Sequence, residues 1–164
     1  MPVEIERKFR VANEGWRAAV RSRSLLRQGY LANTARASVR VRVQEEHNAW
    51  LSVKAMRMGM TRDEYEYAIP VSEARELLDK LCEGVPIEKW RHIVEHAGSR
   101  WEIDEFLAEN AGLVIAELEL PSEAAHFERP AWLGAEVTDE ERYYNVRLAQ
   151  RPFRHWPENL LASR

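Results

Sequence analysis

Apolar and charged residues alternate along most of this 164-residue chain. A period of two residues is typical of β-strands, because successive side chains point to opposite faces of a sheet. The pattern predicts about eight strands, near residues 3–11, 28–32, 39–43, 51–54, 62–69, 89–94, 100–104 and 116–120. Turn signals, such as those around Asn48 and Gly98, separate neighbouring strands. The chain is therefore predicted to be built mainly on strands.

Helices are predicted in four of the segments between and after these strands, at residues 13–20, 72–82, 122–127 and 138–148. Asn13 is a candidate N-cap for the first of them. Thr138 is followed three residues later by Glu141, which is the spacing of a capping box and predicts the start of the last helix. Together with the strands, these segments place the chain in the α+β class.

The size and composition of the chain narrow the range of possible functions. Its length fits one domain, which we predict at residues 1–150, followed by a C-terminal tail at 151–164. The net charge of −3 provides no basic surface for nucleic acid or an acidic membrane. The single cysteine excludes a disulfide framework and fits a cytoplasmic protein. Neither a signal peptide nor a membrane-spanning run is recognisable.

Each predicted strand has one apolar face and one face that is almost entirely ionic. Carboxylates recur at positions i and i+2 of these faces, and so do cations, and such neighbours lie about 7 Å apart. One interpretation is a sheet whose polar face lies in water. The alternative is a closed sheet with the ionic faces inside, where neither set of charges can be left unpaired. A polyphosphate that carries divalent metal ions would supply partners for both sets.

The order of the charged residues resembles a known family. Glu4-Ile5-Glu6-Arg7-Lys8 matches the amino-terminal ExExK signature of the CYTH superfamily, the triphosphate tunnel metalloenzymes. The rest of the set follows in order, with Arg40/Arg42, Lys54, Arg62/Glu64/Glu66, Lys89/Arg91, Asp104 and Glu117/Glu119. Within this family, the chain resembles the small bacterial inorganic triphosphatases. The resemblance implies an eight-stranded antiparallel closed β-barrel, a tunnel with a charged interior and several flanking helices.

The resemblance also implies roles for individual residues. The substrate-binding residues would be Lys8, Arg40, Arg42, Lys54, Arg62, Lys89 and Arg91. The residues that hold Mg²⁺ or Mn²⁺ would be Glu4, Glu6, Glu64, Glu66, Asp104, Glu117 and Glu119. Lys54, Tyr30 and Glu6 would be catalytic. Tyr30 lies in Gln28-Gly29-Tyr30-Leu31, which resembles a segment of small bacterial members whose tyrosine pairs with the lysine equivalent to Lys54. Simple packing is the alternative for this tyrosine.

The expected function is divalent-metal-dependent hydrolysis of inorganic triphosphate to pyrophosphate and phosphate. Two alternatives keep the fold, namely a class IV adenylyl cyclase and a thiamine triphosphatase. A third is a polyphosphate- or nucleotide-binding module without catalysis, against which the carboxylate pairs argue because they would hinder plain anion binding. The expected partner is a small-molecule triphosphate, with no nucleic acid and no membrane, and a homodimer is left open.

Overall fold

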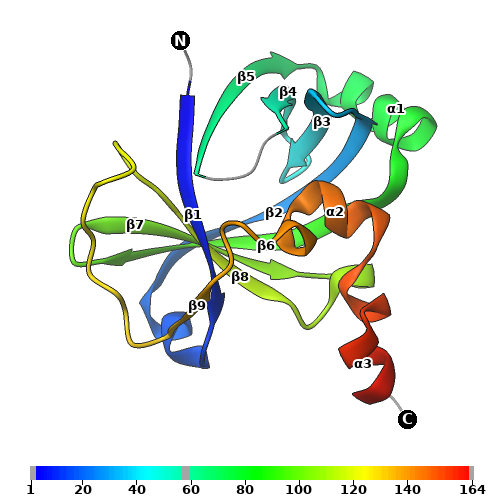
Figure 1. Ribbon diagram of the computed structural model, residues 1–164. Coiled ribbons are helices and arrows are strands. Elements are labelled where there is room, and N and C mark those ends of the chain that lie inside the picture. The colour runs from blue at the N-terminus through cyan, green and yellow to red at the C-terminus, as the bar shows by residue number, and fades with distance from the viewer. Residues whose placement is uncertain (1–2, 57–59, 163–164) are drawn as a thin grey trace.

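A closed β-barrel forms the centre of the molecule (Figure 1). The computed structural model describes residues 3–56 and 60–162. Its strands are β1 (Val3–Val11), β2 (Val20–Asn33), β3 (Ala37–Gln44), β4 (Asn48–Ala55), β5 (Thr61–Ile69), β6 (Glu83–His96), β7 (Ser99–Phe106), β8 (Val114–Glu119) and β9 (Leu133–Glu136). They form one antiparallel sheet in the order β5-β4-β3-β2-β6-β7-β8-β1-β9. Pairing of β5 with β1 closes eight of them into the predicted barrel.

All eight predicted strands are present, but β2 is longer than predicted and β9 was not predicted. β2 covers 14 residues, whereas the alternation indicated only 28–32. Its first half has little apolar alternation because Arg21 and Arg23 lie on the outer surface, where pairing with the equally long β6 continues the strand. β9 was not predicted, and it adds a ninth strand alongside β1 outside the barrel closure.

The helix predictions were partly correct. The segment after Asn13 forms a 3₁₀ turn at Glu14–Ala19, and the Asn13 side chain accepts a hydrogen bond from the Gly15 amide as a cap does. The second prediction is confirmed as α1 (Val71–Leu81). The predicted helix at 122–127 is wrong, since that segment contains only bends and turns.

The capping-box prediction at Thr138 is also wrong. The Thr138 hydroxyl accepts a hydrogen bond from the backbone amide of Lys8 and donates one to Glu136, so the side chain fastens this segment to β1. The helix follows seven residues later as α2 (Asn145–Gln150), after a 3₁₀ turn at Glu141–Tyr143.

The tail, for which no structure was predicted, contains a 3₁₀ turn at Phe153–His155 and α3 (Pro157–Ala162). Trp156 in this tail is buried against Tyr143 and Phe153. None of the helices in the described ranges is long and apolar enough to cross a membrane.

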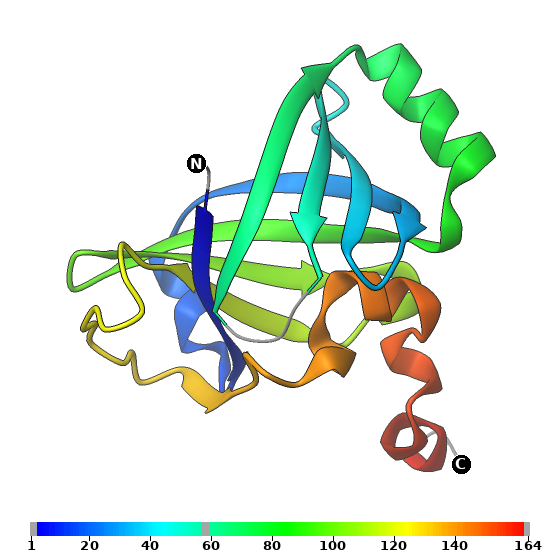
Figure 2. The same cartoon turned by 45° about the horizontal axis from the view of Figure 1, so that its top comes forward.

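The apolar faces of the strands are buried on the outside of the barrel. Trp101 and Phe9 form a cluster there with Trp16 from the 3₁₀ turn and Trp132 from the segment before β9. On another side, α1 packs Ala74 and Leu78 against the outer faces of β3 and β4 (Figure 2). Because the covering elements bury the apolar faces from outside, the ionic faces of the same strands point into the barrel.

One end of the barrel is closed by apolar residues. Tyr30, Ile87, Phe106 and Ile115 come from four strands and form a buried cluster with residues 143–149 of the C-terminal segment. Figures 1 and 2 both place α2 beside β6 at this end. The C-terminal segment therefore closes one end of the ionic interior.

We predict that close packing between β6 and α2 makes Gly84→Ala more destabilising than Gly98→Ala. Both glycines have positive φ, +68° and +82°. A Cβ at Gly84 would collide with the Ala149 carbonyl oxygen at the end of α2, whereas a Cβ at Gly98 meets nothing within 4 Å. Gly98→Ala should lose about 1–2 kcal/mol through backbone strain, and Gly84→Ala about 1–3 kcal/mol more. Urea unfolding measures both, and equal losses would contradict the packing of α2 on β6.

Candidate active site

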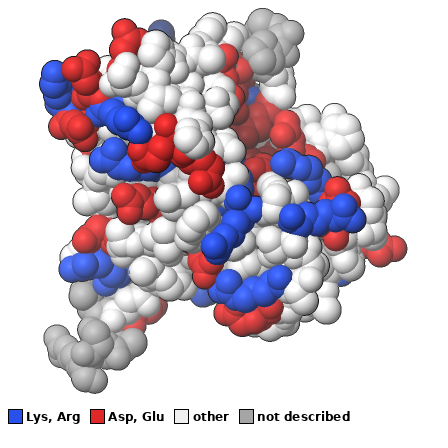
Figure 3. All heavy atoms as spheres, turned by 180° about the vertical axis from the view of Figure 1, so that it is seen from behind, with Lys and Arg blue, Asp and Glu red and all other residues white. Residues whose placement is uncertain are grey.

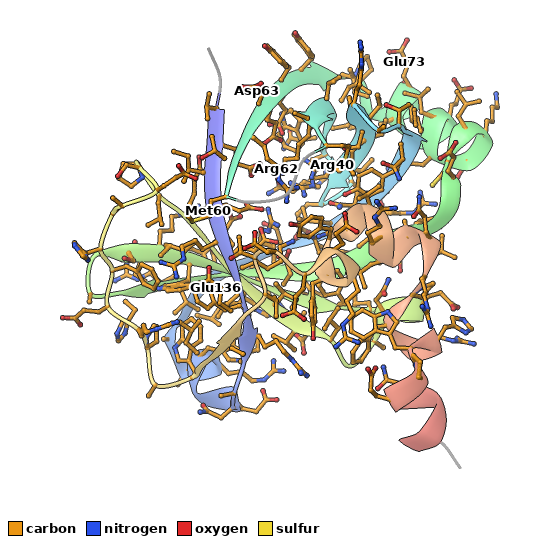
Figure 4. The ribbon with its side chains drawn as sticks, viewed as in Figure 1. Arg40, Met60, Arg62, Asp63, Glu73 and Glu136 are labelled. Atoms are coloured by element: carbon orange, nitrogen blue, oxygen red, sulfur yellow. The ribbon has the colours of Figure 1, made fainter. Side chains whose placement is uncertain are left out.

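The barrel encloses a polar cavity of about 760 Å³. Seven cationic residues line it, namely Lys8, Arg40, Arg42, Lys54, Arg62, Lys89 and Arg91. Seven carboxylates line it as well, namely Glu4, Glu6, Glu64, Glu66, Glu102, Glu117 and Glu119. The structure thus brings together in one cavity every site residue predicted from the sequence, Tyr30 included, with the exception of Asp104. Arg40 and Arg62 extend into the space between the strands, while Glu73 lies on the outer surface (Figure 4).

The two kinds of charge are concentrated on different sides of the barrel. Most carboxylates come from β5, β1, β8 and β7, which are consecutive around the barrel, and we call this side the acidic wall. Most cations come from β6, β3 and β4, and we call this side the basic wall. Acidic side chains gather in a recess on the face shown in Figure 3. A ligand in the cavity would therefore meet carboxylates on one side and cations on the other.

The acidic wall places like charges directly opposite one another. Glu6 is the register partner of Glu119, and Glu102 is the register partner of Glu117. Directly opposed like charges destabilise a sheet. Burial, together with the nearby carboxylates of Glu4 and Glu6, raises the pKa of Glu119. This wall therefore needs additional positive charge.

On the basic wall, cations lie close to other cations. Burial lowers the pKa of Arg42 to about 9, and repulsion from Arg40 and Arg91 adds to the effect. Burial also lowers the pKa of Lys89, to which Arg91 and Arg42 contribute, although Asp104 opposes the shift. These cations lack enough negative charge around them, which makes the wall a site for an anion.

Asp104 does not line the cavity. It is completely buried, and its carboxylate accepts two hydrogen bonds from Arg91, at 2.8 and 2.9 Å, while Lys89 Nζ lies 2.7 Å away. Burial alone would raise the pKa of Asp104, but Arg91 and Lys89 outweigh it and hold the pKa well below its usual range. The structure does not support the prediction that Asp104 binds a metal ion, because both oxygens face these two cations. Asp104 instead holds two cations of the basic wall in place.

Lys54 lies where the two walls meet. Its Nζ is 2.5 Å from Glu4 Oε2, in an ion pair that lacks the geometry of a hydrogen bond. Burial would lower the pKa of Lys54, but Glu6, Glu4 and Glu64 outweigh this and raise it. Lys54 therefore stays cationic next to the carboxylates.

Two buried atoms of the cavity lack hydrogen-bond partners among the described residues. One is the acceptor Glu4 Oε2 and the other is the donor Arg40 Nε. Buried polar atoms are normally paired, and exceptions mark places where an ion, a water molecule or a ligand binds. The Glu4 oxygen has Lys54 as an ion-pair partner but accepts no hydrogen bond, and the Arg40 N–H has no acceptor, so a metal-bound anion would satisfy both atoms.

The carboxylates do not form a complete metal cage by themselves. No three Asp, Glu, His or Cys residues within the ranges 3–56 and 60–162 come close enough to hold an ion alone. Mg²⁺ commonly takes only one or two carboxylates from the protein and completes its shell with water and substrate phosphates. The acidic wall, in which Glu4 Oε2 accepts no hydrogen bond, fits that mode of binding.

Tyr30 lines the closed end of the cavity and is only 7% exposed, packed in the apolar cluster there. In the described part of the chain, Lys54 pairs with Glu4, and no hydrogen bond links Lys54 to Tyr30. The structure favours the packing interpretation of Tyr30 over the predicted pairing with Lys54.

Several cavity residues were absent from the predicted set. Glu102 could have been included, because it stands two residues from Asp104 on the same ionic face. Ser52 accepts a hydrogen bond from Arg40 and donates one to Glu66, which links the two walls. Asn145 reaches the cavity from α2 and binds Lys89. No spacing in the sequence relates Asn145 to the strands.

We predict that Asp104→Asn destabilises the protein by about 3–5 kcal/mol, the usual loss when one member of a buried ion pair is removed. The substitution leaves Lys89 and Arg91 buried beside a neutral group. Asp79→Asn is the control, since the Asp79–Arg27 pair is exposed and should contribute at most about 1 kcal/mol. Chemical denaturation compares them, and similar small losses would show that Asp104 is not what holds the basic wall.

The chain is similar in sequence and fold to proteins whose family is known. The CYTH domain model matches residues 2–151. A curated inorganic triphosphatase of Acetivibrio thermocellus is 47% identical over 158 residues, covering 96% of this chain and 100% of the relative. One of Nitrosomonas europaea is 37% identical over 151 residues, covering 89% and 96%. A crystal structure of an inorganic triphosphatase, 36% identical, covers 89% of this chain and 97% of its own with a TM-score of 0.64. The chain belongs to the CYTH family.

Proposed function

We propose that the chain is an inorganic triphosphatase, which hydrolyses triphosphate to pyrophosphate and phosphate with the help of a divalent metal ion. The observation that carries the proposal is the pair of oppositely charged walls that face one cavity. Relatives at 47% and 37% identity, both named inorganic triphosphatases, support it.

The charge balance of the cavity supports a metal-bound substrate. The seven lining cations stand against eight carboxylates when the buried Asp104 is included, a net charge of −1 if all are ionised. A bare polyphosphate would therefore enter a cavity without net attraction. Positive charge brought in with the substrate would remove the repulsion on the acidic wall and leave the basic wall free for the phosphates.

The residues divide between these two tasks. When bound, Mg²⁺ or Mn²⁺ would be held by Glu4, Glu6, Glu64, Glu66, Glu117 and Glu119 and would stabilise negative charge on phosphoryl oxygens. Lys8, Arg40, Arg42, Arg62, Lys89 and Arg91 grip the phosphate chain. Lys54 is placed to donate to a phosphate oxygen beside the acidic wall. Glu6 orients the attacking water. Rate enhancement then comes from positioning and charge stabilisation.

The alternative activities differ in what the substrate carries besides phosphates. An adenylyl cyclase or a thiamine triphosphatase must also hold a ring, and Tyr65 and Tyr67 are the aromatic residues of β5 that line the cavity. The remaining strand residues around the cavity are mostly charged, which favours inorganic triphosphate. Related structures under 25% identical to this chain, such as a plant protein from Hippeastrum described as a putative adenylyl cyclase with dominant triphosphatase activity, share the fold alone. The cytoplasmic location, the homodimer and the domain boundary at residue 150 stay predictions.

We predict that EDTA abolishes phosphate release from triphosphate and that Mg²⁺ or Mn²⁺ restores it. Ca²⁺ should restore it poorly, because its looser coordination misplaces the attacking water. A phosphate assay with triphosphate, ATP, thiamine triphosphate and pyrophosphate as parallel substrates gives both metal dependence and preference. Full activity in metal-free buffer, or no release from triphosphate under any condition, would refute the proposed function.

We predict that Arg42→Ala lowers kcat/KM for triphosphate about 100-fold, a typical loss for one preorganised charge-stabilising donor. Folding should be largely preserved, since the substitution relieves crowding with Arg40 and Arg91. Arg21→Ala is the matched control, because Arg21 is exposed on β2 and pairs with Glu95. A folded Arg42→Ala variant with the kcat/KM of the control would show that Arg42 does not bind substrate.

A further inference from the structure

Two neutral amides connect cations of the basic wall. Gln28 on β2 is fully buried, and its Oε1 accepts a hydrogen bond of 2.8 Å from Arg42 Nε. Asn145, the first residue of α2, accepts with its Oδ1 from Lys89 Nζ at 2.8 Å and from Gln28 Nε2 at 3.3 Å. These hydrogen bonds run from Arg42 through Gln28 and Asn145 to Lys89. They link β3 to β6 by way of β2 and α2.

If the stability of the fold alone determined which residue stands at positions 28 and 145, a carboxylate would be expected there in place of the amide. Burial lowers the pKa of Arg42 to about 9, and repulsion from the nearby Arg40 and Arg91 adds to the effect. An anion beside Arg42 or Lys89 would relieve the repulsion, as Asp104 does for Lys89 and Arg91. An amide oxygen satisfies the N–H group without neutralising its charge. The two amides therefore keep the wall electropositive at the expense of stability.

The cations of the basic wall differ in how far the protein balances their charge. Arg91 also approaches Glu102, at 2.9 Å, so part of its charge is balanced by protein carboxylates. The described side chains that hydrogen-bond to Arg42 present no carboxylate, only the amide of Gln28. A negative substrate placed against Arg42 would complete the balance that the protein leaves open there, whereas Lys89 already pairs with Asp104 at 2.7 Å.

We propose that Gln28 and Asn145 are positioning residues of the triphosphate site, whose amide oxygens fix Arg42 and Lys89 in place without adding negative charge to the side of the cavity that faces the phosphates. The proposal rests on the proposed function and adds a role for α2. The helix closes one end of the cavity, and through Asn145 it also sets the position of a substrate-binding cation.

Asn145→Asp tests the proposal, because it changes charge with little change in shape. An aspartate oxygen can still accept from Lys89 and from Gln28, so both hydrogen bonds survive. A phosphate oxygen bound to Lys89 would lie within about 6 Å of the new charge, given hydrogen bonds of about 2.8 Å on each side of the ammonium. We expect KM for triphosphate to rise on the order of tenfold to a hundredfold, with a smaller change in kcat. The melting temperature should be unchanged or higher.

Two further variants separate charge from structure. Asn48→Asp adds the same charge at the exposed first residue of β4, and it should keep the wild-type KM. Asn145→Ala removes both accepted bonds without adding charge. It should lower the melting temperature and raise KM less than Asn145→Asp does. A purely structural role predicts the reverse order, with the alanine variant worse in both stability and KM.

The outcomes distinguish this proposal from the function on which it rests. The thermal shift that triphosphate plus Ca²⁺ produces is measured beside activity, because it reports binding without turnover. If the wild type binds triphosphate but does not hydrolyse it, the proposed function fails while the thermal shift still tests the amides. A folded Asn145→Asp variant with wild-type KM and wild-type thermal shift overturns the proposal. So does an Asn145→Asp variant less stable than Asn145→Ala.

Discussion

Most carboxylates line one side of the barrel and most cations line the other, so that the two sets face each other across one cavity. Neither wall contains enough charge of the opposite sign to balance its own. Direct pairs exist between Lys54 and Glu4, where the two walls meet, and between Lys8 and Glu117 within the acidic wall. Elsewhere, glutamates oppose glutamates in register, and Arg42 lies among other cations. A folded chain tolerates such an arrangement only if the rest of the structure supplies the stability. The arrangement therefore indicates a ligand that carries both signs of charge.

The rest of the fold compensates for this interior. Apolar residues pack on the outside of the barrel, where the tryptophan cluster and α1 cover the strands, and at its closed end, where the C-terminal segment packs. Barrel closure also removes free strand edges, so that backbone pairing continues around the cavity. Asp104 on β7 is fully buried, and its carboxylate fixes Lys89 and Arg91 of the basic wall without occupying the cavity. The apolar outer faces of the strands thus provide stability, and the ionic inner faces of the same strands form the binding site.

The alternation of side chains along a strand is a local rule, and it predicted the strands and their ionic faces. The closed barrel and most of the cavity residues were predicted from the resemblance to the CYTH family. The same rule failed where local pattern and tertiary position differ. Asp104 has the same parity as Glu102, yet its place between Lys89 and Arg91 buries it behind the cavity lining. Thr138 has the spacing of a cap, but a hydrogen bond to β1, 130 residues away in sequence, uses its hydroxyl. Asn145 and Gln28 are likewise brought together across 117 residues, which no spacing motif reveals.

Differential scanning fluorimetry at constant ionic strength tests the central claim. The claim is that the two walls together bind one ligand that carries both positive and negative charge. Glu6→Gln is suited to it, because it removes one metal-facing charge and slows turnover while keeping the side-chain size. The account predicts a rise in melting temperature of several degrees with triphosphate and a divalent ion together, and a much smaller rise with either alone. Shifts that follow only ionic strength, in a well-folded sample at millimolar triphosphate, would contradict it.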